Sequence, residues 1–141
     1  QAMGWDWFSL HLNNGSKLMA FRMHAANQSE KVRKDNDKRG ENHENEVFTT
    51  ASYITENGNK ETLSQDDIFI SPLKSETVQR ENSRHVVPSH WQIKIPSKDI
   101  DVTISAFKKD QWNDSVFPYY EGRVQVKGSH SGSGFMELTG Y

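Results

Sequence analysis

Apolar and polar residues alternate along most of the chain, and this pattern predicts β-strands. Near the start, Phe8, Leu10 and Leu12 share one face of an extended segment. Asn14-Gly15 follows, a pair that favours a two-residue hairpin turn because both residues tolerate positive φ. The return strand then carries three large apolar residues on one face, which we expect to be buried: Met19, Phe21 and Met23.

Alternation and turn residues predict three further hairpins. The Thr- and Tyr-rich stretch 47–55 pairs with 61–73, and the stretches 90–95 and 100–107 alternate most regularly. A last pair runs over 119–126 and 134–140. Four hairpins give about eight strands, and no segment shows the 3.6-residue periodicity of a helix.

Each predicted strand has one apolar face, and no helix is available to cover it. The apolar faces must therefore meet one another, and closure into a barrel also removes exposed strand edges. We expect an all-β fold, an eight-stranded antiparallel lipocalin-like barrel, with a two-sheet sandwich as the alternative.

Length and charge narrow the function classes. The 141 residues fit one domain spanning 1–141, with a polar loop insertion at 24–46, where Val32 is the only large aliphatic residue before Val47. The formal net charge of -2 does not indicate the excess of basic residues that is typical of nucleic-acid-binding proteins. No apolar run approaches the ~20 residues of a membrane span. Without cysteine there are no disulfides and no thiolate chemistry.

Several segments, in order, resemble one known family. They are 4–10 (GWDWFSL), 14–19 (NGSKLM), 63–68 (LSQDDI) with 71–73 (SPL), 91–96 (WQIKIP), 119–128 (YYEGRVQVKG) and 134–141 (GFMELTGY). The chain is similar over nearly its whole length to the C-terminal domain of the AttH-like family, which groups with carotenoid 1,2-hydratases (CrtC-like proteins) and with predicted secreted hydrolases.

That resemblance implies an organisation and a function class. It implies two lipocalin-like barrels in tandem, so the expected partner is an N-terminal lipocalin-like domain of the same parent protein. It also implies export to the periplasm or the outside of the cell, and an apolar or amphipathic ligand, lipid- or terpenoid-like. No cofactor is expected.

Hydratase chemistry itself does not carry over to this chain. The hydratases have a His/Trp motif shortly upstream of the Trp-Asp-Trp segment, in a region absent from this chain, and a Tyr-x-Asp-type element near the second strand, where this sequence reads LMAFRM (18–23). A general acid for an alkene needs a carboxyl group with a raised pKa, a role that Arg22 cannot fill. The alternative function is therefore half of a hydratase or isomerase site whose acid comes from the other domain.

No catalytic residue and no metal site is predicted. Asp6 is the carboxylate of most interest: it either orients a ligand or serves as an acid at the barrel mouth, or it bonds nearby backbone or pairs with an arginine. Glu121 and Arg123 share a face that we expect to point outward. The Gly- and Ser-rich stretch 128–134 is expected to be a turn. The candidate ligand-binding residues, lining the interior or its mouth, are Trp5, Asp6, Trp7, Phe21, Met23, Trp91, Ile93, Tyr120, Val124 and Met136.

Overall fold

The computed structural model describes residues 3–25, 46–108, 111–113 and 119–141. Within them the chain forms ten β-strands and two short 3-10 helices. The elements are β1 (Met3–Leu12), β2 (Lys17–Ala25), β3 (Glu46–Ile54), β4 (Lys60–Leu63), η1 (Gln65–Asp67), β5 (Phe69–Gln79), β6 (Arg84–Ile95), η2 (Pro96–Lys98), β7 (Ile100–Ala106), β8 (Trp112–Asn113), β9 (Tyr119–Gly128) and β10 (Gly132–Thr139).

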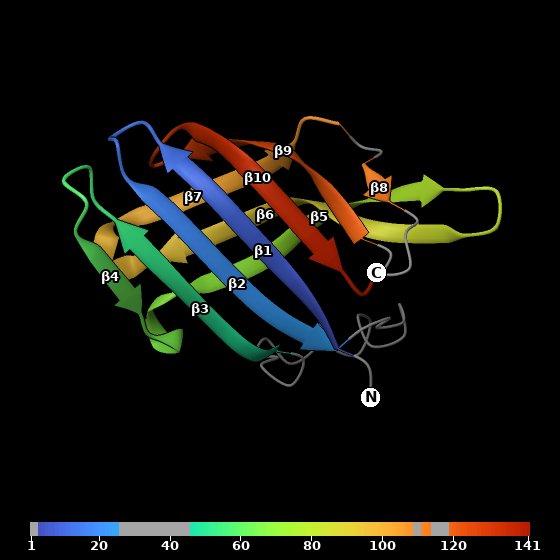
Figure 1. Ribbon diagram of the computed structural model, residues 1–141, viewed down its shortest axis with the longest axis horizontal. Helices are drawn as coiled ribbons and strands as arrows, with labels where there is room; N and C mark the ends of the chain where they lie inside the picture. The colour runs from blue at the N-terminus through green and yellow to red at the C-terminus, as the bar shows by residue number, and fades with distance from the viewer. Residues whose placement is uncertain (1–2, 26–45, 109–110, 114–118) are drawn as a thin grey trace.

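The strands form one antiparallel sheet in the order β4-β3-β2-β1-β10-β9-β7-β6-β5, with β8 paired to β9. The sheet curls, so that β3, β2, β1 and β10 cross over β5, β6 and β7 (Figure 1). Asp67 in η1 accepts a hydrogen bond from the backbone N–H of Ser97 in η2 at 3.1 Å, which ties the β4–β5 connection to the β6–β7 turn. The expected all-β antiparallel fold is confirmed. None of the described residues belongs to a helix long and apolar enough to span a membrane.

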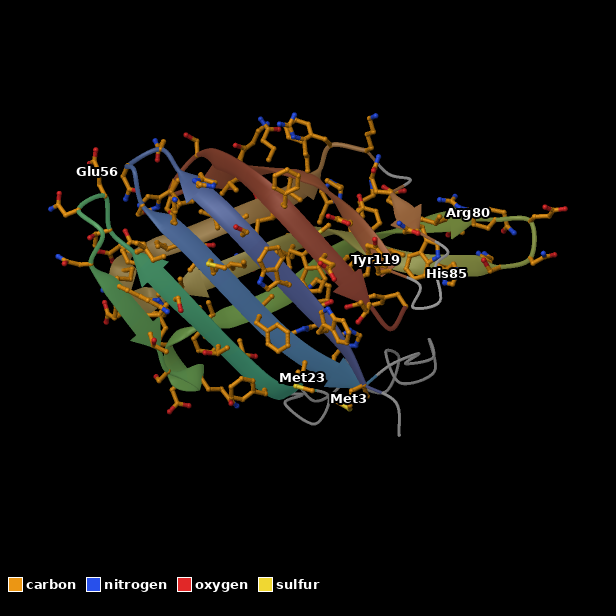
Figure 2. The ribbon with its side chains drawn as sticks, in the orientation of Figure 1. Met3, Met23, Glu56, Arg80, His85 and Tyr119 are labelled. Atoms are coloured by element: carbon orange, nitrogen blue, oxygen red, sulfur yellow. The ribbon has the colours of Figure 1, made fainter. Side chains whose placement is uncertain are left out.

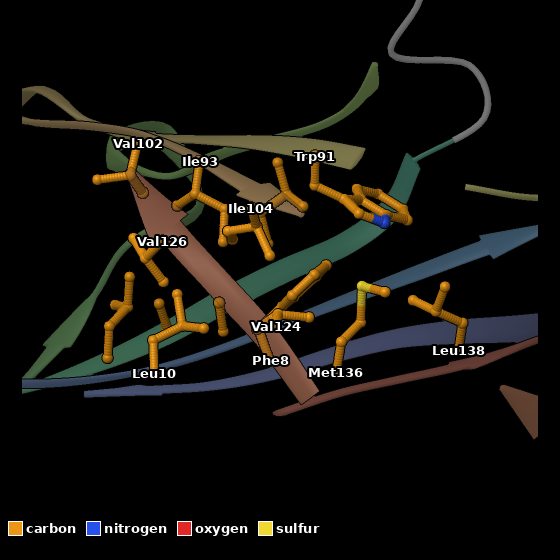
Figure 3. Packing of buried hydrophobic residues seen from close by; sticks show 14 of the residues in the cluster. Phe8, Leu10, Trp91, Ile93, Val102, Ile104, Val124, Val126, Met136 and Leu138 are labelled. Carbon is orange, nitrogen blue, oxygen red and sulfur yellow. The ribbon is translucent and has the colours of Figure 1, made fainter. Parts of the chain in front are cut away.

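The apolar core lies inside this curl. Figure 3 shows Trp91 and Ile93 of β6 pointing toward Phe8 of β1 and Met136 of β10. All four are fully buried, and the rings of Phe8 and Trp91 meet edge to face with centroids 5.2 Å apart. Burial of apolar surface stabilises a fold by roughly 25 cal/mol per Å², so this contact between the two halves of the sheet stabilises the curl.

The expectation that Met19, Phe21 and Met23 face the interior is wrong. The first hairpin has a three-residue loop, closed by a hydrogen bond from the N–H of Leu12 to the oxygen of Ser16, with Gly15 at φ 83°. This is the alternative to a two-residue turn, in which a left-handed glycine follows a turn. One extra loop residue reverses every side chain of the return strand. The buried face of β2 therefore carries Leu18, Ala20, Arg22 and His24.

Two other segments differ from their expected limits. The return strand of the second hairpin is divided into β4 and β5 by η1, and β5 continues to Gln79. Of the predicted loop insertion, residues 24 and 25 lie in β2 and residue 46 in β3, while 26–45 fall outside the described residues.

Candidate functional site

A buried ion pair lies at one end of the apolar interior. Asp6 and Arg22 are directly opposite each other on β1 and β2, on the inner face. The Nε of Arg22 donates to Asp6 Oδ2 at 2.8 Å, and the guanidinium also lies 5.0 Å from the ring centroid of Trp91. Asp6 is fully buried and Arg22 is 9 % exposed. Of the two roles expected for Asp6, the structure shows pairing with an arginine.

The last residue of the chain completes this pair. Gly140, at φ 87°, adopts a conformation that other residues rarely take, and it redirects the chain after β10. Tyr141 then donates its phenol O–H to Asp6 Oδ1 at 2.7 Å. Its backbone oxygen lies 2.8 Å from His85 Nδ1, so both ends of Tyr141 are held. Both carboxyl oxygens of Asp6 thus accept hydrogen bonds.

His24 fills the space beside this cluster. Its Nε2 lies 3.0 Å from the carbonyl oxygen of Thr139 and 3.6 Å from Asp6 Oδ1. A Cβ on Gly4 would lie 2.4 Å from the Thr139 oxygen and 2.7 Å from the His24 ring, so only glycine fits at position 4. We call Asp6, Arg22, His24 and Tyr141 the buried polar cluster.

Burial dominates the electrostatics of this cluster. Loss of hydration raises the pKa of Asp6 above its ordinary 3.8, although the nearby Arg22 charge acts in the opposite direction. Desolvation lowers the pKa of Arg22, but the charges and hydrogen bonds of Asp6 and Tyr141 together raise it further, so the net shift is upward and the guanidinium stays charged. Desolvation likewise raises the pKa of the Tyr141 phenol well above 10.0. Because Asp6 accepts from both Arg22 and Tyr141, the cluster is a bonded structural unit rather than an acid poised toward a substrate.

The candidate ligand-binding residues separate into two groups. Five lie in the interior, each at most 1 % exposed: Trp91, Ile93, Tyr120, Val124 and Met136. Four lie on the outer surface of β1 and β2: Trp5, Trp7, Phe21 and Met23. Only Asp6 stands at the boundary between the core and the polar cluster. The structure therefore does not bring the ten candidates together as one site.

A separate cavity of about 560 Å³ lies on the outer surface beside β8, β9 and β10. Sequence reasoning missed it as a site, although Glu121 and Arg123 face outward as expected and form part of its wall. We call it the outer cavity; its lining residues are Arg80, Gln111, Trp112, Asn113, Glu121, Gly122, Arg123 and Phe135.

The outer cavity combines charge with aromatic surface. The exposed Arg123 guanidinium lies 5.9 Å from the ring centroid of Phe135, which is 48 % exposed. Arg80 is anchored by its Nη2, which donates to the backbone oxygen of Trp112 at 2.8 Å. A Cβ on Gly122 would approach the Gln111 side chain to 3.0 Å, so glycine there gives Gln111 its room in the wall. The sequence alone does not indicate that residues near 80 and 112 lie beside β9.

Two other features concern metal binding and the Gly- and Ser-rich stretch. Among the residues that the structure describes, no three His, Asp or Glu side chains are grouped as metal ligands. Of the Gly- and Ser-rich stretch 128–134 expected to be a turn, only residues 129–131 lie between the strands: Gly128, at φ 120°, ends β9, and residues 132–134 belong to β10.

Comparison with known proteins places this fold in a family. The AttH-like family model matches residues 1–141. An AttH-type protein from Nitrosomonas europaea is similar in structure, with a TM-score of 0.73 and 26 % identity over 98 % of this chain and 38 % of that one. Kievitone hydratase from Nectria haematococca has a TM-score of 0.69 and 20 % identity, over 96 % of this chain and 39 % of its own. No curated protein matches the sequence. This chain spans well under half the length of either solved protein, and it belongs to the AttH-like family.

Proposed function

We propose that the chain is a binding domain for an amphipathic small molecule, that the ligand occupies the outer cavity, and that the domain is half of an exported two-domain protein. One observation carries the proposal: a cavity of about 560 Å³ whose wall joins an exposed arginine to an exposed phenylalanine. This volume falls within the ~300–1,000 Å³ typical of small-molecule sites. The interior is a weaker candidate, because Trp91, Ile93 and Met136 pack there without solvent exposure.

The residues of the wall define the ligand's chemistry. An acidic group would pair with the guanidinium of Arg123, and a flat apolar body would cover the ring of Phe135. Glu121 lies two residues along β9 on the same face, so the acidic group belongs at the Arg123 side of the cavity. Gln111 and Asn113 add amide groups that suit hydroxyl or carbonyl substituents. Lipid- and terpenoid-like acids have this combination.

A titration with a fluorescent polyene fatty acid tests the proposal. Arg123→Gln should weaken binding about 10- to 100-fold, because a charge-assisted hydrogen bond contributes roughly 1.5–3 kcal/mol. Lys127→Gln is the matched control, since it removes the same charge from an exposed site four residues along the same strand. Glu121→Gln should strengthen binding by removing repulsion. Saturable binding that Arg123→Gln leaves unchanged would place the ligand elsewhere.

The aromatic part of the site needs its own control. Phe135→Ala should weaken probe binding, whereas Phe69→Ala should not, although Phe69 is exposed to a similar extent (45 % against 48 %). No saturable binding of the probe by the unmodified chain would defeat the proposal.

A second candidate is half of a hydratase-type site acting on an apolar substrate. This candidate rests on the fold that the chain shares with kievitone hydratase at 20 % identity. Asp6 is engaged by Arg22 and Tyr141, so the acid would come from another domain. Hydration of a polyene by the complete parent protein, retained in Arg123→Gln, would favour this candidate.

A further inference from the structure

The outer surface of β1, β2 and β3 carries large apolar side chains side by side. Trp5 pairs with Met23, which pairs with Phe48 across the next strand, and Trp7 pairs with Phe21 beside them. Trp5 is 39 % and Phe48 45 % exposed. Cross-strand partners lie on one face within about 5.5 Å of each other, so these five form a continuous patch. We call Trp5, Trp7, Phe21, Met23 and Phe48 the aromatic face.

The residues of the aromatic face do not belong to the apolar core. The opposite side of the same strands is already buried, with Phe8, Leu18 and Ala20 each at most 1 % exposed. A face of tryptophan, phenylalanine and methionine without a charged member has the composition of the centre of a protein interface. Charged residues stand at its edge: Glu137 opposite Trp7 on β10, and Lys17 at the start of β2. Such a rim is typical of a surface that another protein covers.

The position of the chain's first strand indicates which partner fits. Met3, where β1 begins, pairs with residue 25, and Met23 lies at the same end of the sheet (Figure 2). A polypeptide segment joined ahead of β1 would therefore emerge beside the aromatic face. In the two similar solved proteins, this chain corresponds to only 38 % and 39 % of the length.

We propose that the aromatic face is the docking surface for a companion domain of the same polypeptide. The inference rests on the two-domain organisation of the proposed function, but not on the ligand or on the outer cavity. The companion's matching surface would be apolar and free of charge at its centre, because an unpaired charge opposite Trp5 or Phe48 would lose its hydration without a partner.

Hydroxyl-radical footprinting of this chain and of the complete gene product tests the assignment. We expect Phe48, Trp5 and Met23 to be oxidised about fivefold more slowly in the complete polypeptide, since an interface core excludes water. Phe69 is the matched control: it is also 45 % exposed but lies on β5, away from the face, and its rate should not change. Equal rates for Phe48 and Phe69 in the complete polypeptide, or a gene without a further domain, would overturn the proposal.

A charge variant separates docking from folding. Met23→Glu should restore the oxidation rate of Phe48 in the complete polypeptide, while Thr77→Glu, which adds the same charge at an exposed site on β5, should not. Circular dichroism and thermal unfolding of the isolated chain check that both variants fold. Protection of Phe48 in this chain alone that grows with concentration, with a dimer in sedimentation, would identify a second copy as the partner and contradict the proposal. Probe binding at the outer cavity should be unchanged in Met23→Glu, so loss of docking and loss of ligand binding are told apart.

Discussion

Replacement of Asp6 by asparagine should be among the most destabilising single changes in the chain. Asp6 is fully buried and receives hydrogen bonds from Arg22 at 2.8 Å and from Tyr141 at 2.7 Å. Asparagine keeps the shape but removes the negative charge, so the buried Arg22 guanidinium loses its ion pair with Asp6. Breaking a buried pair in this way costs about 3–5 kcal/mol. A domain of this size has roughly 5–15 kcal/mol of stability, so a large fraction would be lost.

The assay is thermal and urea unfolding followed by circular dichroism. The midpoint of Asp6→Asn should fall by about 10–20 °C. Asp101→Asn is the control: Asp101 is an exposed carboxylate that also accepts a hydrogen bond, from Gln92 at 3.0 Å, and its replacement should change the midpoint little. The double variant Asp6→Leu with Arg22→Met should lose much less than the single one, because desolvation of the pair, which already raises the pKa of Asp6, disappears with both charges. A loss below about 1 kcal/mol in Asp6→Asn would refute this account of the buried polar cluster.

Three further predictions concern the C-terminal tyrosine and two glycines. Tyr141→Phe should cost about 1–3 kcal/mol in urea unfolding, because Asp6 Oδ1 loses its buried donor; an unchanged midpoint would contradict that. The pKa of Tyr141 is raised above 10.0, so the folded state holds this proton more tightly than the unfolded chain. The stability it contributes is complete below pH 10 and is lost as the pH rises above that value, and melting curves from pH 9 to 12 should fall more steeply for the parent than for Tyr141→Phe. Gly134→Ala should destabilise by about 3 kcal/mol, since its Cβ would lie 2.0 Å from the backbone oxygen of Ser9. Gly58→Ala, at φ 86° but with open space around it, should lower the free energy of unfolding by only about 1 kcal/mol. Equal losses of stability in the two glycine variants would show that the space at position 134 does not limit the side chain.

The sequence predicted the strands whose two faces differ clearly. In β6 and β7, Trp91, Ile93 and Ile104 alternate with polar residues, and all three are fully buried. The same pattern placed Val124 and Met136 correctly in the core. In these segments a single periodicity of two leaves only one way to bury the apolar side.

The strand β2 has apolar residues on both faces, and there the pattern could not decide. The larger set was expected inside, but the loop length determines the outcome. In the observed register Phe8 is opposite Ala20 and Leu10 opposite Leu18. A two-residue turn at Asn14-Gly15 would instead have paired Phe8 with Phe21. Asn-Gly is compatible with both loops, so the local sequence did not distinguish them.

The site was harder to predict than the fold. The pairing of Asp6 with Arg22 follows from the register of the first hairpin, and the contact with Tyr141 joins the two ends of the chain. The outer cavity depends on Arg80 meeting Trp112 across a separation of 32 residues. Such long-range contacts leave no periodic signal in the sequence.

A titration followed by nuclear magnetic resonance tests the central claim most directly, namely that the ligand lies outside the curled sheet. With the polyene fatty acid added to the isotope-labelled chain, the account predicts shifts of the backbone amides of Gly122, Arg123 and Phe135 that saturate together. The methyl groups of Ile93, Val124 and Met136 should stay unshifted. Saturable shifts of those interior methyl groups, with Arg123 and Phe135 unchanged, would contradict it.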